Sequence, residues 1–136
     1  MKSIAITGSK GLIGNKFYCQ YKKKYKITKY IYDINNYKKI NEFIRKNNFS
    51  YFLHFASFSR SNCIINKKKC YITNYLSTKN IVNKLKYKNT KLIFLSSSHI
   101  YKKTNKKIKE SFSKKPINYY GKLKLKSENY IIKNLK

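Results

Sequence analysis

The chain has 136 residues, enough for one domain with its own hydrophobic core. Its formal net charge is +29, because 33 lysines and arginines face only four acidic residues. A charge of this size usually indicates a nucleic-acid or membrane-surface partner. The basic residues are nearly all lysines scattered among Asn, Ile and Tyr, whereas a dedicated nucleic-acid surface uses more arginine. We therefore interpret the charge mainly as codon bias and keep polyanion binding, including nucleic acid, as an alternative.

The sequence also argues against three other classes of protein. No apolar stretch reaches membrane-spanning length, and the amino terminus lacks the long apolar core of a cleavable signal. Cys19, Cys63 and Cys70 are widely spaced and are expected to be reduced thiols. Neither they nor the two histidines, His54 and His99, form a metal-ligand pattern. We expect a cytoplasmic protein without a membrane partner, a metal site or a disulfide framework.

Strand and helix patterns alternate along the chain. Residues 2–7 form a short apolar run before a glycine, as a buried parallel strand would. The expected elements are strand 2–7, helix 12–24, strand 25–33, helix 35–47, strand 50–57, helix 67–86, strand 91–98 and helix 118–135. This alternation predicts an α/β fold with a doubly wound parallel sheet and helices on both faces. Because there is no linker or repeat, residues 1–136 are expected to form one domain.

The segment TGSKGLIG places three of the four glycines between the first expected strand and the first expected helix. Gly8 would permit a tight turn, Gly11 would let the backbone approach a pyrophosphate, and Gly14 would let helix and strand pack closely. The helix N-terminus adds unpaired N–H groups and a positive dipole end. The pattern indicates a Rossmann-like dinucleotide-binding domain rather than a plain turn. The expected cofactor contacts here are Gly8, Gly11, Leu12, Ile13 and Gly14.

Asp33 follows the second expected strand, where a carboxylate would accept hydrogen bonds from the adenosine ribose hydroxyls. This placement favours NAD, because the carboxylate would repel a 2′-phosphate. Lys10, inside the glycine loop, argues for NADP, which is therefore not excluded. The alternative role for Asp33 is to cap the next helix, a position for which Asn35 and Asn36 are equal candidates.

A tyrosine followed four residues later by a lysine occurs five times, close to what chance gives in so tyrosine- and lysine-rich a chain. Tyr120 and Lys124 form the last of these pairs, and only their surroundings distinguish them. They follow a strand that ends in serines, and Pro116 stands four residues before the tyrosine. On a helix the two side chains would share one face, and a nearby ammonium lowers the pKa of a phenol from its usual value near 10.

Five segments, in order, resemble the extended short-chain dehydrogenase/reductases: TGSKGLIG, FLHFAS, NYLSTKN, FLSSSHIY and PINYYGKLKLKSE. The chain looks like their NAD-dependent epimerase/dehydratase branch, whose members modify nucleotide-linked sugars. The resemblance implies an oxidoreductase-type epimerase, dehydratase or reductase with NAD(P) as cofactor and a nucleotide-linked sugar as substrate. The alternatives are a non-catalytic dinucleotide-binding remnant and a polyanion-binding protein.

The resemblance also implies roles for particular residues. Ser97, Tyr120 and Lys124 would be catalytic, with Ser96 and Ser98 as alternatives to Ser97. Tyr120 would exchange a proton with the sugar hydroxyl, and Lys124 would also hold the nicotinamide ribose. The cofactor site would further include Phe55, Ala56, Ser57 and Asn74.

Two residues keep an alternative structural role. His54 matches the family motif but is expected to be a packed strand residue, and Asn74 could be a simple surface asparagine. Members of the family are about twice as long as this chain, which is expected to stop one helix after Tyr120. The fold would then be a sheet truncated after the Tyr–Lys helix, without a substrate domain. Its exposed sheet edge would invite pairing with a second copy or a complementary chain.

Overall fold

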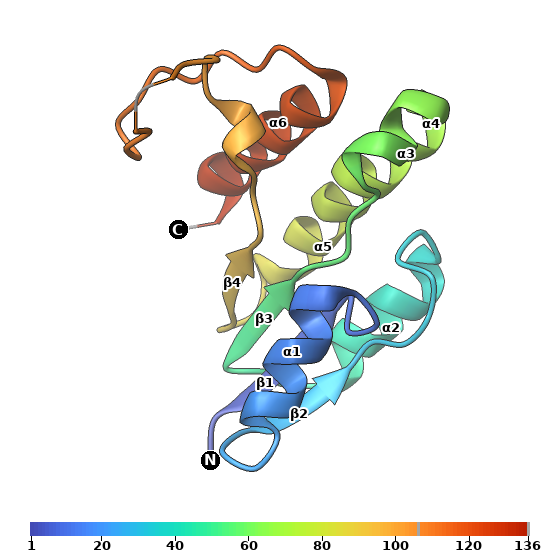
Figure 1. Cartoon of the computed structure of the whole chain (residues 1–136). Helices are drawn as coiled ribbons and strands as arrows, with labels where there is room; N and C mark the ends of the chain where they lie inside the picture. Colours follow the sequence, from blue (N-terminus) through green and yellow to red (C-terminus); the bar gives the residue numbers. More distant parts are fainter. Residues whose placement is uncertain (106, 136) are drawn as a thin grey trace.

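The computed structural model describes residues 1–105 and 107–135, and Figure 1 shows how their elements are arranged. The strands are β1 (Ser3–Thr7), β2 (Lys26–Lys29), β3 (Tyr51–His54) and β4 (Lys91–Phe94). The α-helices are α1 (Leu12–Tyr21), α2 (Tyr37–Lys46), α3 (Arg60–Ile65), α4 (Lys67–Tyr71), α5 (Ser77–Leu85) and α6 (Tyr119–Asn134). A π-helical turn (Ile72–Leu76) joins α4 to α5, and a 3₁₀ turn (Ser98–Ile100) follows β4. Within the described ranges, none of the helices has the length and apolarity needed to cross a membrane.

All the strand pairs of the sheet are parallel, and the strand order is β2-β1-β3-β4. The chain passes from β1 to β2 on one side and then crosses back to place β3 on the other side of β1. The sequence-based prediction of a parallel Rossmann-like α/β fold is therefore confirmed. In such sheets, ligands bind at the carboxyl ends of the strands where the order reverses, which here is the gap between β1 and β3.

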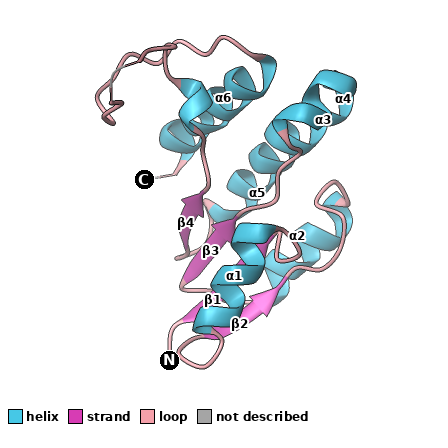
Figure 2. Ribbon diagram, in the orientation of Figure 1, coloured by secondary structure: helices cyan, strands magenta, loops and turns pink. Residues whose placement is uncertain are grey.

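Alternating side chains of the central strands supply a core on each face of the sheet. Ile4, Ile6 and Leu53 point to the face covered by α1. Ala5 and Phe52 point to the opposite face, where α2 and α5 pack (Figure 2). The apolar residues that these two helices bury against that face are Ile40, Ile44, Ile81 and Leu85. The strands are thus hydrophobic on both faces, as a buried parallel sheet requires.

A third core cluster lies beyond the sheet, between the α3–α4 segment and α6. It contains Cys63, Cys70, Tyr75 and Leu123. Cys63 and Cys70 form a disulfide, with their Cα atoms 5.0 Å apart, so the prediction of reduced thiols is wrong for this pair. The sequence did not predict α3, so it did not show that α3 and α4 bring these two residues together; Cys19 is a free, exposed thiol.

The helix expected over residues 67–86 is divided into three parts in the structure. Asn66 ends α3 and caps α4, because its side-chain oxygen accepts a hydrogen bond from the Lys69 N–H (2.8 Å). The helix then widens to a π turn at Ile72–Leu76 before continuing as α5. π turns are rare and are often found at functional sites.

Three strands are shorter than their sequence patterns predict, since β3 covers Tyr51–His54 rather than residues 50–57 and two others also end early. β2 ends at Lys29 rather than near Asp33, and β4 ends at Phe94 rather than near Ser98. A strand ends where its pairing with the neighbouring strand ends. The pairing of β4 with β3 stops at Phe94 and His54, and β4 therefore ends at Phe94. The polar residues that follow β4 leave the sheet and form the 3₁₀ turn.

The sequence left Asp33, Asn35 and Asn36 as candidates for the N-cap of α2, and the structure identifies the one that caps the helix. The Asn36 side chain accepts a hydrogen bond from the Lys39 N–H (3.1 Å) and is the cap. Asp33 instead accepts a hydrogen bond from the Asn35 N–H (2.9 Å). We expect Asn36→Ala to lower the free energy of unfolding by about 1 kcal/mol. Urea denaturation checks this value. Asp33→Asn keeps an acceptor oxygen and is the control; an equal loss in both variants would contradict the assignment.

Candidate functional site

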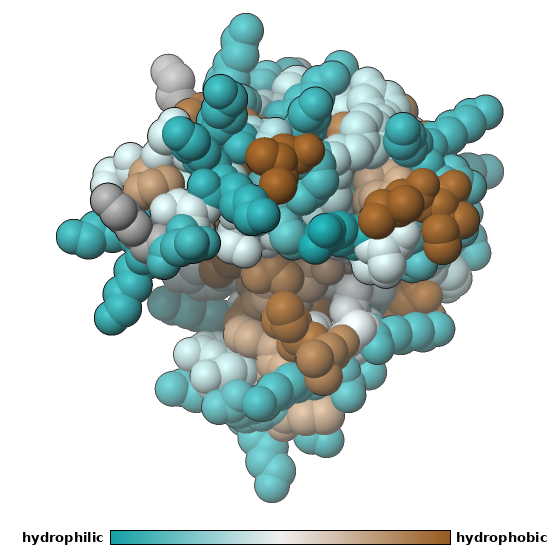
Figure 3. Space-filling model, turned by 45° about the horizontal axis from the view of Figure 1, so that its top comes forward, coloured by the Kyte–Doolittle hydropathy of each residue, from teal (hydrophilic) through white to brown (hydrophobic). Residues whose placement is uncertain are grey.

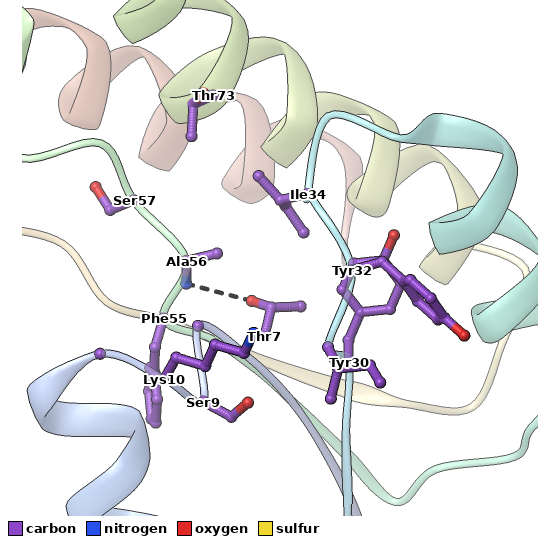
Figure 4. Close-up of a pocket in the computed structure, with 13 residues that line it drawn as sticks. Thr7, Ser9, Lys10, Tyr30, Tyr32, Ile34, Phe55, Ala56, Ser57 and Thr73 are labelled. Atoms are coloured by element: carbon purple, nitrogen blue, oxygen red, sulfur yellow. Dashed lines mark hydrogen bonds between the residues drawn. The ribbon is translucent and has the colours of Figure 1, made fainter.

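A cavity of about 280 Å³ opens at the carboxyl ends of β1 and β3, where the strand order reverses (Figure 4). Residues 7–11 of the glycine loop form one wall, and residues 55–57, which follow β3, form a second. Side chains after β2 and Thr73 of the π turn complete it. The residues after β2 that line the cavity are Tyr30, Ile31, Tyr32 and Ile34. The cavity therefore lies at the position that the topology predicts for a ligand.

Gly8 brings the two strand ends together. Its φ of +72° lies in the region that side chains disfavour, and a Cβ on Gly8 would lie 2.5 Å from the Ala56 nitrogen. The Gly11 N–H donates to the Gly8 carbonyl (3.0 Å) and closes the turn. The loop backbone can follow this path next to β3 only because Gly8 has no side chain.

The predicted contacts in the glycine loop fall into two groups. Gly8 and Gly11 line the cavity, together with Ser9 and Lys10. Leu12 and Ile13 begin α1 with exposed side chains and are not part of the cavity wall. Gly14 is buried, and a Cβ there would collide with the Gly8 carbonyl. Gly14 was predicted to let helix and strand pack closely. In the structure it lets α1 pack against the loop backbone at Gly8 and Ser9, just after β1.

Asp33 is exposed, and its Oδ1 accepts a hydrogen bond from the Asn35 backbone N–H. The carboxylate does not line the cavity, although its neighbour Tyr32 does. Lys10 does line it and is drawn among the lining residues in Figure 4. Asp33 indicated NAD and Lys10 indicated NADP, and the structure places only Lys10 at the cavity. The Lys10 cation is in the wall of the cavity and the Asp33 carboxylate is outside it.

Phe55, Ala56 and Ser57 all line the cavity, and Asn74 fixes the end of this segment. Asn74 Oδ1 accepts hydrogen bonds from the Phe58 N–H (2.7 Å) and the Ser57 hydroxyl (3.1 Å), and its amide donates to the Phe58 carbonyl (2.9 Å). Asn74 is only 2% exposed, so the alternative of a surface asparagine is wrong.

His54 is a buried strand residue, as expected, and it links two threonines. Thr7 Oγ1 accepts from the Ala56 N–H (3.3 Å) and lies 2.7 Å from His54 Nδ1, to which it donates when the ring proton is on Nε2. Thr78 donates to the Asn74 carbonyl (3.2 Å), so it accepts from the N–H at His54 Nε2 (3.0 Å). Burial, with Lys124 nearby, lowers the His54 pKa to about 3. A neutral histidine fits this chain of donors and acceptors.

The same Asn74 carbonyl connects the cavity to α6. The Ser127 hydroxyl on α6 donates to it (2.8 Å), and Ser127 is fully buried. Lys124, nearly one turn earlier on α6, is 2% exposed and donates from Nζ to the Leu95 carbonyl just after β4 (2.9 Å). These bonds hold α6 against the carboxyl ends of the strands.

The Lys124 ammonium is buried between aromatic side chains. It lies 4.7 Å from the centre of the Phe94 ring and 5.7 Å from the centre of the Tyr120 ring. Burial lowers the pKa of Lys124 to about 8. The structure thus brings Tyr120 and Lys124 together at the end of β4, with a lysine able to change protonation near neutral pH.

Ser97 belongs to the segment that α6 covers. Its hydroxyl accepts a hydrogen bond from the His99 N–H (3.2 Å) and caps the 3₁₀ turn. Among the described residues, the alternative Ser96 has a buried hydroxyl without a hydrogen-bond partner, and Ser98 is exposed. His99 packs edge-on against Tyr120, with ring centres 6.0 Å apart. The choice of Ser97 as the catalytic hydroxyl stays a prediction.

The sequence did not predict several residues that position this site. Gly121 is the fourth glycine, and a Cβ there would collide with the His99 carbonyl, so the start of α6 can approach the 3₁₀ turn. Thr7, Thr78 and Ser127 are small polar residues that the structure buries. Gly121, Thr7, Thr78 and Ser127 all lie inside the segments that carry the family resemblance, so those segments were the signal that could have pointed to them.

The site fits a dinucleotide cofactor. The glycine loop leaves a cradle at the N-terminus of α1, where a side chain at Gly8 would collide with the chain after β3. No side chain caps α1, so its first N–H groups have no side-chain partner and can face an anion. Gly8 and Gly11 would hold the phosphates, and residues 55–57 would lie along the cofactor.

The fold and this site define a Rossmann-like α/β domain with a glycine-rich loop at its switch point. The chain belongs to the RmlD substrate binding domain family, whose model matches residues 1–136. The resemblance to short-chain dehydrogenase/reductases is confirmed at this broader level, whereas the epimerase/dehydratase branch stays a prediction. No curated protein matches the chain.

Solved structures support the fold over nearly the whole chain. A dTDP-4-dehydrorhamnose reductase from Bacillus anthracis, in complex with NADP, has a TM-score of 0.90 and 20% identity, covering 99% of this chain and 51% of that one. The UDP-Glc/GlcNAc 4-epimerase from Campylobacter jejuni has a TM-score of 0.90 and 22% identity, covering 98% and 49%. The dTDP-4-dehydrorhamnose reductase from Yersinia enterocolitica has a TM-score of 0.87 and 26% identity, covering 98% and 49%. The chain thus spans about half the length of these proteins.

The depressed pKa of Lys124 predicts a pH dependence of stability. Between pH 8 and 10.5 the unfolded chain keeps a lysine proton that the folded state has released, so the free energy of unfolding rises with pH. The difference between the ordinary lysine pKa of 10.5 and the folded-state pKa of about 8 corresponds to a rise in the free energy of unfolding of at most about 3 kcal/mol. Urea denaturation from pH 7 to 10.5 should show this rise in the native protein but not in Lys124→Met. Lys122→Met, on an exposed position of α6, should behave like the native protein; identical curves for both variants would refute the assignment.

Proposed function

We propose that this chain is the NAD(P)-binding part of a nucleotide-sugar reductase or epimerase, with Ser97, Tyr120 and Lys124 at the reacting centre. The observation that carries the proposal is the buried Lys124 ammonium beside Tyr120, on a helix bonded through Ser127 and Asn74 to the wall of the cofactor cavity. Membership of the RmlD family and the activities named for the similar structures agree with it.

Tyr120 and Lys124 would divide the proton chemistry between them. In reduction of a keto sugar, the Tyr120 phenol gives its proton to the carbonyl oxygen as that oxygen becomes a hydroxyl. The Lys124 ammonium stabilises the phenolate that remains and favours its formation in the reverse direction. Ser97 would hold the same oxygen by a hydrogen bond. The bound nicotinamide supplies or accepts the hydride.

NAD and NADP place different demands on the cavity. Asp33 lies outside the cavity wall, and its Oδ2 would accept hydrogen bonds from the ribose hydroxyls of an NAD molecule that extends past the wall, while Oδ1 accepts from the Asn35 N–H. Lys10 lines the cavity and would attract the extra phosphate of NADP. NADP is bound in the similar B. anthracis structure. Both cofactors therefore belong in the tests, as reduced forms whose fluorescence reports binding.

Gly11 gives a test of cofactor binding at a position where a side chain needs only a small shift of the backbone. Its φ of −76° suits any residue, and a Cβ there would lie 3.3 Å from the Gly8 carbonyl oxygen. We expect saturable binding of NADH or NADPH to the native chain and at least roughly ten-fold weaker binding to Gly11→Ala, about 1.4 kcal/mol. Fluorescence titration measures both. Gln20→Ala, at the far end of α1, is the control. Absence of saturable, Gly11-dependent binding would refute the proposal.

Tyr120 can be tested against its own neighbour, because Tyr119 is also a phenol in the first turn of α6. We expect Tyr120→Phe to slow oxidation of the reduced cofactor by a nucleotide-linked keto sugar at least roughly 100-fold, the usual contribution of a positioned acid. Its cofactor affinity should stay within about two-fold, since one hydroxyl is removed at the reacting end. Absorbance at the nicotinamide band follows the rate. Equal rates in Tyr120→Phe and Tyr119→Phe would remove Tyr120 from the mechanism.

A further inference from the structure

A separate cavity, of about 320 Å³, lies beside the 3₁₀ turn that follows β4. It is open to solvent and is lined by the first residue of α3, the 3₁₀ turn, the connection after it and the residues just before α6. In Figure 1 this connection, coloured orange, arches beyond the carboxyl ends of the strands. The polar residues that line the cavity are Arg60, Ser98, His99, Lys102, Lys103, Thr104 and Asn118.

The charges around this cavity are all of one kind. Three side chains with permanent positive charge line it, those of Arg60, Lys102 and Lys103. Among the described residues that line it, none is acidic. The ion pairs in the described part of the chain lie elsewhere, between Lys46 and Glu42 and between Lys114 and Glu128. An anion bound in the cavity would be attracted by all three charges.

Lysines alone would not mark a site on this protein. Figure 3 shows hydrophilic side chains extending from all around the outline of one face, and hydrophobic residues as separate patches. Arginine is informative because the chain has only two, Arg45 and Arg60. Its planar guanidinium binds two phosphate oxygens at once, which a lysine cannot do. Ser98 and Asn118 add neutral donors to the same cavity.

Tertiary contacts hold the wall of the cavity in place. The Asn118 side-chain amide donates to His99 Nδ1 (3.3 Å), and the Lys102 N–H donates to the Ser113 carbonyl (3.0 Å). The His99 ring also packs edge-on against the Tyr120 ring. His99 therefore lies between the cavity and the Tyr120 phenol that is proposed to react.

We propose that this cavity binds a phosphate or diphosphate group. Arg60 supplies the bidentate contact, Lys102 and Lys103 supply charge, and Ser98 and Asn118 supply neutral hydrogen bonds. If the proposed function holds, the anion is the diphosphate of the nucleotide-linked sugar. Arg60 would then hold the diphosphate of the substrate while the reacting carbon of the sugar lies at Tyr120.

Inorganic pyrophosphate is the direct probe, and Arg45 is the matched control. Arg45 lines a different cavity with Lys38, Lys84 and Lys88, but that cavity also contains the carboxylate of Glu42. Isothermal titration at constant ionic strength should give saturable binding to the native chain. We expect Arg60→Gln to weaken it roughly ten-fold or more, the effect of a charge-assisted hydrogen bond, and Arg45→Gln to change it less than about two-fold.

An equal loss in the two variants, with affinity falling steeply as salt rises, would overturn the proposal, because net charge alone would then explain the binding. Absence of saturable binding would overturn it as well. A repeat with saturating NADPH separates this cavity from the glycine loop: the Arg60-dependent component should persist, and its disappearance would refute a separate site. Failure of NADPH itself to bind would count against the proposed function only, since the comparison of Arg60 with Arg45 needs no cofactor.

Discussion

The close approach of the glycine loop to the chain after β3 is the constraint on which the candidate site depends. Because Gly8 carries no side chain, the backbone after β1 passes next to Ala56 at the point where the strand order reverses. This contact fixes the distance between the two strand ends and therefore the width of the cavity. A larger residue would separate the two walls and would also remove the Ala56 N–H from Thr7.

From that contact, a continuous set of buried hydrogen bonds reaches α6. It passes from Ala56 through Thr7, His54 and Thr78 to the Asn74 carbonyl, which also receives the Ser127 hydroxyl. Every donor in this set has an acceptor, so burying the polar groups costs little. The placement of Tyr120 and Lys124 is thereby tied to the position of the glycine loop, and the two halves of the proposed chemistry share one rigid framework.

Periodicity and turn residues predicted the sheet and the larger helices, because apolar runs such as residues 2–7 bury both faces of a strand. The six-residue helix α3 escaped prediction because so short a segment shows no helical period, and with it the Cys63–Cys70 pair was missed. The spacing of Tyr120 and Lys124 was visible in the sequence, but the burial of Lys124 was not. That burial follows from packing of α6 against β4 and the 3₁₀ turn, which no local pattern encodes.

The π turn at Ile72–Leu76 has a consequence for how the chain tolerates change. One additional residue in a helical turn rotates everything that follows by about 100°. Ile81, Val82 and Leu85 are almost fully buried, while Asn74 faces the residues after β3, and both orientations depend on that extra residue. Deletion of a single residue here would turn the apolar side of α5 toward water. The length of this segment is therefore fixed more strictly than its composition.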